Sequence, residues 1–250
     1  MGVFFLDLEY VSGNLYLTDI FEIALLSQNS KHLFHNYIRL RYSLPQYIQK
    51  LTHINDRFLI ENGHSFEGAM CNFVNFLEYE QLLDPTPIEI VAHGGFNSDF
   101  PILLTNCLKY NFKKIDVLTK SCFIDSMLTF KNAGWTRPGL DSLCEEINLA
   151  RNSHSAVTDV YLLKTIYSNH PELPKYRYSY SEISIFTNKK IPLSFISLNT
   201  LAMESKSNLD LKTKLIEKLN DKTSLNRAQV EKISIYFFNN RYLLHFLYTK

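Results

Sequence analysis

Two acidic side chains stand two positions apart in an apolar segment near the start of the sequence, Val3-Phe-Phe-Leu-Asp7-Leu-Glu9. The segment predicts a β-strand, in which side chains alternate between two faces, so Asp7 and Glu9 are expected to share one face about 6–7 Å apart. Two carboxylates on one apolar face repel each other and resist desolvation, and a bound cation removes both costs. The alternative is that the strand end frays and water solvates both acids.

A third acid follows a glycine turn in the segment Val91-Ala-His93-Gly-Gly-Phe96-Asn-Ser-Asp99, which leads into an apolar stretch. Ligand sites of α/β proteins gather just beyond the carboxyl ends of the strands, so Asp99 is expected to face Asp7 and Glu9 there. The alternative is an ordinary acid in the first turn of a helix, favoured by the helix dipole. A lone histidine such as His93 is more typical of a hydrogen-bonded loop residue than of a ligand.

A histidine and a fourth acid stand five positions apart in His154-Ser-Ala-Val-Thr-Asp159. Apolar Val160, Leu163 and Ile166 predict the buried face of a helix that contains Asp159. Five residues of α-helix rotate by about 140°, so His154 and Asp159 cannot share one face of a regular helix. We therefore expect His154 in the segment before the helix, where it is either a movable base beside a metal ligand or an incidental loop residue.

Taken together, the order of these residues resembles the DEDDh exonuclease family over roughly residues 3–168. The segment from His93 to Asp99, followed by Phe-Pro-Ile-Leu, is most similar to the three-prime repair exonucleases (the TREX group) and the PML-type exonucleases, where the acid also lies six positions after the histidine. Leu51-Thr-His-Ile54 is similar to the loop that packs near the terminal nucleotide in this family, and Cys122-Phe-Ile-Asp-Ser126 is similar to a strand of the family.

The resemblance implies a two-metal mechanism with two Mg²⁺ or Mn²⁺ ions, about 4 Å apart, which stabilise the nucleophile and the leaving 3′ oxygen. By resemblance Asp7 bridges both ions, Glu9 and Asp159 hold the ion on the nucleophile side, and Asp99 reaches the second ion through water. His154 then deprotonates the attacking water, since an imidazole with an unperturbed pKa of about 6.5 suits a base at neutral pH. The expected products are 5′-mononucleotides released from a 3′ end.

The substrate is expected to be a nucleic acid with a free 3′ end. The second motif favours DNA, single-stranded or frayed at the 3′ end, and RNA remains the alternative because related family members degrade it. Candidate contacts to the terminal nucleotides are Leu8, Tyr10, Ile54, His93 and Phe96, with ordinary packing as the alternative for each. The sequence departs from the family pattern at Tyr10, His53, Gly94 and Thr158, which concerns the nucleotide pocket and not the five catalytic positions.

Strands that alternate with helices must position these residues. The predicted strands are Val3–Glu9, Ile20–Leu26, His32–Leu40, Ile88–Ala92 and Lys120–Ile124, with a turn at Gly13 and Asn14. The predicted helices are Phe66–Leu82, Asp99–Tyr110, Leu140–Ile147, Ser155–Tyr167, 209–220 and 225–248. The expected fold is α/β, an RNase H-like three-layer arrangement with a mixed five-stranded sheet flanked by helices and a mainly helical C-terminal appendage.

Charge divides the 250-residue chain into two parts. Residues 1–170, the expected exonuclease domain, carry 13 basic and 18 acidic side chains, whereas residues 171–250, the expected basic linker and helical C-terminal region, carry 13 and 7. The basic part predicts either contacts with the phosphate backbone or a solvated helical surface.

The remaining composition excludes several protein classes. A hydrophobic content of 46% is too high for a disordered chain, and no stretch of 18 apolar residues predicts a membrane span. The four cysteines form no CxxC motif and suit a reducing compartment, and no signal peptide is evident, so we expect an intracellular protein of the cytoplasm or nucleus. The resemblance also suggests a homodimer.

Two other functions stay open at this point. One alternative is a binding-only descendant of such an enzyme, against which all five catalytic positions being filled argues. Hydrolysis of a labelled oligonucleotide with Mg²⁺, and its loss with EDTA, discriminates this alternative from the nuclease. The other alternative is an interaction protein that docks a partner through the aromatic segment Phe237–Tyr248, with nuclease activity secondary.

Overall fold

The computed structural model describes residues 2–11, 18–148, 155–173, 175–180, 183 and 204–219. The chain divides into two compact units, residues 1–183 and 184–250. The predicted turn at Gly13 and Asn14, the segment with His154 and the helix expected over 225–248 lie outside the described residues.

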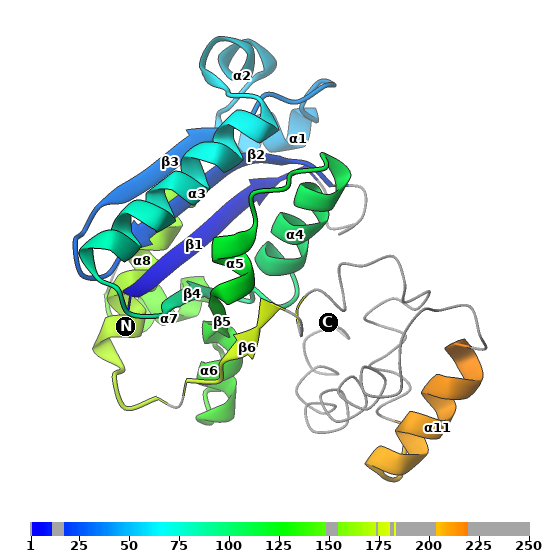
Figure 1. Cartoon of the computed structure of the whole chain (residues 1–250). Helices are drawn as coiled ribbons and strands as arrows, with labels where there is room; N and C mark the ends of the chain where they lie inside the picture. Colours follow the sequence, from blue (N-terminus) through cyan, green and yellow to red (C-terminus); the bar gives the residue numbers. More distant parts are fainter. Residues whose placement is uncertain are drawn as a thin grey trace. The chain divides into compact units, whose positions relative to one another are not determined.

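One mixed sheet forms the centre of the first unit (Figure 1). Its strands in spatial order are β3 (Leu33–Tyr37), β2 (Ile20–Ser27), β1 (Gly2–Tyr10), β4 (Ile88–Ala92), β5 (Cys122–Asp125) and β6 (Tyr178–Ser179). The pairs β1–β4 and β4–β5 are parallel, and the other three pairs are antiparallel. The predicted mixed α/β sheet flanked by helices is confirmed, with a sixth short strand, β6, in addition to the five expected.

Helices occupy most of the sequence between the strands. They are α1 (Gln46–Thr52), α2 (Asp56–Asn62), α3 (Phe66–Leu83), α4 (Asp99–Lys109), α5 (Asp116–Lys120), α6 (Ser126–Asn132), α7 (Leu140–Glu146), α8 (Ala156–Asn169) and, in the second unit, α11 (Asn208–Leu219). Helices α3, α4, α7, α8 and α11 begin and end within two residues of the predicted helices. The sequence did not predict α1, α2, α5 and α6, and Lys120 belongs to α5 instead of the fifth strand.

The alternation of β1 builds a core on both faces of the sheet. Val3 and Phe5 pack on the apolar side of α8, where the ring of Phe5 lies 5.6 Å from that of Tyr167. Phe4 points to the other face and meets Phe76 of α3. Figure 1 shows α3 in front of the sheet and α8 behind it. The burial of Val3, Phe4 and Phe5 contributes about 1.5–3 kcal/mol for each side chain, so β1 is held firmly between two helical layers.

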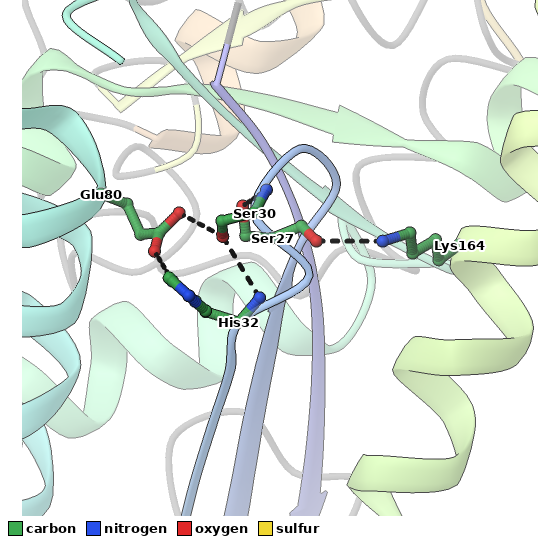
Figure 2. Close-up of polar contacts among 5 residues, drawn as sticks. All are labelled: Ser27, Ser30, His32, Glu80 and Lys164. Carbon is green, nitrogen blue, oxygen red and sulfur yellow. Dashed lines mark hydrogen bonds and ion pairs between the residues drawn. The ribbon is translucent and has the colours of Figure 1, made fainter. Parts of the chain in front are cut away.

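Polar contacts tie the turn between β2 and β3 to both layers (Figure 2). Glu80 of α3 accepts a hydrogen bond from the Ser30 hydroxyl at 2.7 Å, and its second oxygen lies 2.6 Å from Nδ1 of His32. From the other layer, Nζ of Lys164 in α8 donates to the carbonyl oxygen of Ser27 at 3.1 Å. These contacts join α3, α8 and the turn between β2 and β3.

Two features that the composition bears on, the cysteines and possible membrane-spanning helices, can be examined in the structure. All four cysteines are free, and two of them, Cys107 and Cys144, are buried. Among the described residues, no helix has the length and apolar character that crossing a membrane requires.

Candidate metal centre

Three predicted acids meet at the end of β1. Asp7, Glu9 and Asp159 each offer a carboxylate oxygen, and these oxygens lie within 4.8 Å of one another. The arrangement follows from the packing below it: Val3 and Phe5 face α8, so Asp7 and Glu9 continue along the same face of β1 toward the start of that helix. The apolar contacts between β1 and α8 therefore bring together carboxylates that would otherwise repel each other.

The start of α8 suits an acidic side chain. Ser155 caps the helix by accepting a hydrogen bond from the amide of Thr158, and Asp159 lies in the first turn with 4% of its surface exposed. The positive end of the helix dipole stabilises a carboxylate at this place. Asp159 is thus fixed by the helix start, directly after the segment that contains His154.

Asp99, the fourth predicted acid, is not part of this group of three and is hydrogen-bonded to the backbone of β1. The parallel pairing of β1 with β4 ends at Phe5 and Val91, so β4 does not pair with the amide of Leu8. The Leu8 amide instead donates to Oδ1 of Asp99 at 3.1 Å, and the Ser98 hydroxyl donates to Oδ2 at 2.6 Å. Burial raises the pKa of Asp99, which the hydrogen bonds from Ser98 and Leu8 partly oppose. The start of α4 is therefore bonded to the strand that carries Asp7 and Glu9.

Asp125 organises the turn before Asp99, and the sequence analysis gave it no role in the site. Its side-chain oxygens accept hydrogen bonds from the amides of Gly94 at 3.1 Å, Phe96 at 3.0 Å and Leu128 at 3.2 Å. Burial raises its pKa to about 6, against the lowering effect of these hydrogen bonds. Gly94 has a φ of +71°, and a Cβ on Gly95 would lie 2.6 Å from the Cβ of Ala92. The turn thus requires two glycines and a buried carboxylate.

The acids create a negative electrostatic potential at this end of the sheet. Burial, and then the charges of Asp99, Asp7 and Glu9, raise the pKa of the Tyr10 hydroxyl above its usual value of 10.0. The half-buried Tyr10 side chain interacts electrostatically with all three carboxylates. A cation is the natural counterpart of such a potential.

The donor set fits Mg²⁺ or Mn²⁺. All donors are carboxylate oxygens, which these hard ions prefer, and Mg²⁺–oxygen distances of about 2.1 Å place ligand atoms up to about 4.2 Å apart. The spacing of the oxygens of Asp7, Glu9 and Asp159 is close to this value.

The residues expected to contact the substrate lie in several parts of the first unit. Leu8 and Ile54 are buried, and Ile54 packs with Val11 and Phe21 in the link between α1 and α2. The residue before it, His53, ends α1 with a φ of +59°, a conformation that favours glycine. The link between α1 and α2 is therefore a folded turn, and contact of Ile54 with a nucleotide stays a prediction.

His93 and Phe96 belong to the turn that Asp125 organises. Nδ1 of His93 lies 2.9 Å from the hydroxyl of Ser126, as expected for a hydrogen-bonded loop residue. Phe96 is 2% exposed and its ring meets that of Tyr178 at 4.8 Å. Phe96 packs inside the protein in this structure, so base stacking by Phe96, like nucleotide contact by His93, stays a prediction. His154, the expected base, lies outside the described residues.

Comparisons with known proteins show similarity of fold to solved structures, but they do not assign the chain to a family. No family model and no curated protein matches the sequence. Among solved structures, the nuclease domain of 3′hExo, described as a DEDDh family member bound to rAMP, has a TM-score of 0.58 and 14% identity over 70% of this chain and 96% of that chain.

Two further solved structures are similar. A full-length 3′-exonuclease has a TM-score of 0.58 and 15% identity, covering 71% of this chain and 66% of that one. A 3′-exonuclease described as recognising the 3′ end of the histone mRNA stem-loop has a TM-score of 0.57 and 13% identity, covering 72% of this chain and 91% of that one. These comparisons do not distinguish the TREX or PML-type group. Over 70–72% of its length, the chain has the α/β fold of these 3′-exonuclease structures, one of which is described as a DEDDh family member.

Proposed function

We propose that the chain is a metal-dependent 3′–5′ exonuclease that hydrolyses phosphodiester bonds of a nucleic acid and releases 5′-mononucleotides. The observation that carries this proposal is the meeting of Asp7, Glu9 and Asp159 at the end of β1, with their oxygens within 4.8 Å. The hydrogen bond from the Leu8 amide to Asp99 supports it, because it holds the fourth acid beside the same strand.

Each acidic side chain has a distinct task in the proposed reaction. In this proposal Asp7, Glu9, Asp159 and Asp99 would hold two metal ions: Asp7 would serve both, Glu9 and Asp159 the ion on the nucleophile side, and Asp99 the second ion through water. Two bound ions supply stabilisation of negative charge on the attacking and leaving oxygens. His154, which precedes the cap of α8, is assigned to accept the proton of the attacking water.

Single-stranded or frayed DNA is the proposed substrate. The spacing of His93 and Asp99 supports DNA, because it matches the TREX and PML-type exonucleases. RNA is the second candidate, since two of the similar structures are described with rAMP and with a histone mRNA stem-loop. A homodimer, as the resemblance suggests, is part of the same proposal.

Digestion of matched DNA and RNA strands tests the reaction and the substrate together. Strands labelled at the 5′ end should shorten stepwise with Mg²⁺ or Mn²⁺, and strands labelled at the 3′ end should release a labelled mononucleotide first. EDTA or a blocked 3′ end should stop both, and DNA should be degraded faster than RNA. Faster loss of RNA would select the second candidate, and absence of metal-dependent shortening of either strand would exclude the nuclease.

A further inference from the structure

A fully buried glutamate lies directly opposite Glu9 in the sheet. Glu22 of β2 pairs with Glu9 of β1, and residues opposite each other on antiparallel strands point to the same face with their Cβ atoms about 4.5–5.5 Å apart. Glu22 has 0% of its surface exposed. It therefore adds a buried carboxylate beside the acids of the candidate metal centre.

One oxygen of Glu22 is held by a histidine. Nε2 of His35 on β3 lies 2.9 Å from Oε1 of Glu22, and the His35 side chain is 26% exposed. An ionised carboxylate accepts hydrogen bonds only, so Nε2 of His35 carries the hydrogen of this contact. His35 thus fixes the orientation of Glu22 on the face of the sheet that carries Glu9.

The other oxygen of Glu22 lacks a donor within the described part of the chain. Oε2 is buried and has no hydrogen-bond partner there. A buried acceptor without a donor costs about 1–3 kcal/mol, and more when it is charged. Glu9, the opposite residue, has a carboxylate that only accepts, so the missing donor is not supplied across the strand pair.

We propose that Glu22 is a positioning residue that accepts a hydrogen bond from a water molecule bound to the metal held by Asp7, Glu9 and Asp159. Mg²⁺ keeps several of its waters when it binds a protein, and each such water offers O–H donors. With Oε1 fixed by His35, Oε2 is the oxygen left for this water. This inference rests on the proposed function, because it requires a metal at the same acids.

The binding of Mn²⁺ without nucleic acid tests this inference, and calorimetry or electron paramagnetic resonance measures it. The amide oxygen of Glu22→Gln can still accept from His35, but its NH₂ group replaces Oε2 with a donor that cannot accept from water. The expected result is a dissociation constant for Mn²⁺ about tenfold higher or more, in the range known for the outer partners of metal sites. A matched control is Glu89→Gln, since Glu89 is also buried and paired, with Arg177, but lies on β4 opposite Val3. Its Mn²⁺ affinity should remain unchanged.

A second variant separates metal binding from folding. Glu22→Met fills a similar volume without a buried charge, so the melting temperature in EDTA should stay equal or rise while Mn²⁺ affinity falls. Measurements on Glu22→Met also test the inference if Glu22→Gln does not fold. A structural role alone predicts the reverse, with lower stability and unchanged affinity, and that result would overturn the inference. Wild-type protein that binds no Mn²⁺ would overturn the proposed function as well, whereas equal binding by wild type and both variants would overturn this inference alone.

Discussion

Asp159 tests the metal centre most directly, because it is the one carboxylate of the three that comes from a helix. In Asp159→Asn, one ligand charge is lost and the shape is kept, so hydrolysis should fall about 10³-fold or more. Without metal, the melting temperature should remain equal or rise, because one of three mutually repelling charges is gone. Rates with Mg²⁺ and thermal unfolding in EDTA measure the two effects.

The metal-induced stabilisation supplies a control for this variant. Wild-type protein should gain melting temperature as Mn²⁺ is added, since a ligand that binds only the folded state stabilises it. Asp159→Asn should lose most of that gain. An equal gain in both proteins would show that the ion binds elsewhere.

His154 should affect turnover and not metal binding. In His154→Ala the acids at the end of β1 are unchanged, so the Mn²⁺ affinity should stay within about twofold of wild type while turnover drops by about 10²–10⁴-fold. Parallel calorimetry and rate measurements distinguish the two quantities. A variant that cleaves at the wild-type rate would remove His154 from the proposed mechanism.

The sequence predicted some residues of the candidate site and not others. Strand alternation predicted that Asp7 and Glu9 share a face, and helix periodicity put Asp159 on a buried face. That the three meet was predicted from the family resemblance, and the structure brings them together. The roles of Asp125 and Glu22 could not be predicted, since two of the three amides that Asp125 binds lie about 30 positions away and the partner of Glu22 is a histidine on another strand. The sequence carried only a weak signal for them, an acid within an apolar strand.

At the scale of the elements, length decided much of what could be predicted, although the seven-residue α7 was predicted as well. Helices such as α3 and α8 run for 18 and 14 residues, which is enough for helical periodicity to show. Helices α1, α2, α5 and α6 have 5–7 residues, and β6 has two residues that depend on pairing with β5. Their conformations are set by tertiary contacts that no local pattern records.

The contacts of Glu80 with the turn between β2 and β3 predict how the stability of the fold depends on pH. Burial alone would raise the pKa of Glu80, but the hydrogen bonds from Ser30, His32 and Ser27 outweigh it and lower the pKa below 4.5. The folded-state pKa is thus below the unfolded value, so ionised Glu80 stabilises the fold above the unfolded pKa. This contribution is lost as the pH falls through the folded pKa.

Glu80→Gln should therefore lower the free energy of unfolding near pH 7 by about 1–3 kcal/mol. The difference in the free energy of unfolding between this variant and wild type should shrink as the pH falls toward 3. Urea unfolding at several pH values measures this difference. Glu61→Gln is the control, because Glu61 forms an exposed pair with Arg57 that should contribute less than about 1 kcal/mol. A difference for Glu80→Gln that is constant from pH 7 to 3 would contradict the role of its ionised form.

At the scale of the whole chain, the domain division expected at residue 170 stays a proposal. In the structure, the sequence divides into compact units between residues 183 and 184. Residues between these positions contribute β6 to the sheet and Arg177, whose guanidinium pairs with the buried Glu89. A chain ending at 170 should lose about 2 kcal/mol relative to one ending at 183, because Glu89 is left buried without its cation.

The chain ending at residue 183 also tests the basic region. Residues 184–250 carry 11 basic and 5 acidic side chains, so all of the positive excess lies beyond the boundary of the first unit. If these cations contact phosphates, the logarithm of the binding constant for single-stranded DNA should fall with the logarithm of salt concentration by about 0.7 per contact. The truncated chain should keep metal-dependent hydrolysis and show a flatter salt dependence, measured by fluorescence anisotropy with Ca²⁺ in place of Mg²⁺. A slope equal to that of the full chain would assign residues 184–250 to a solvated surface, because binding would then depend only on the first unit.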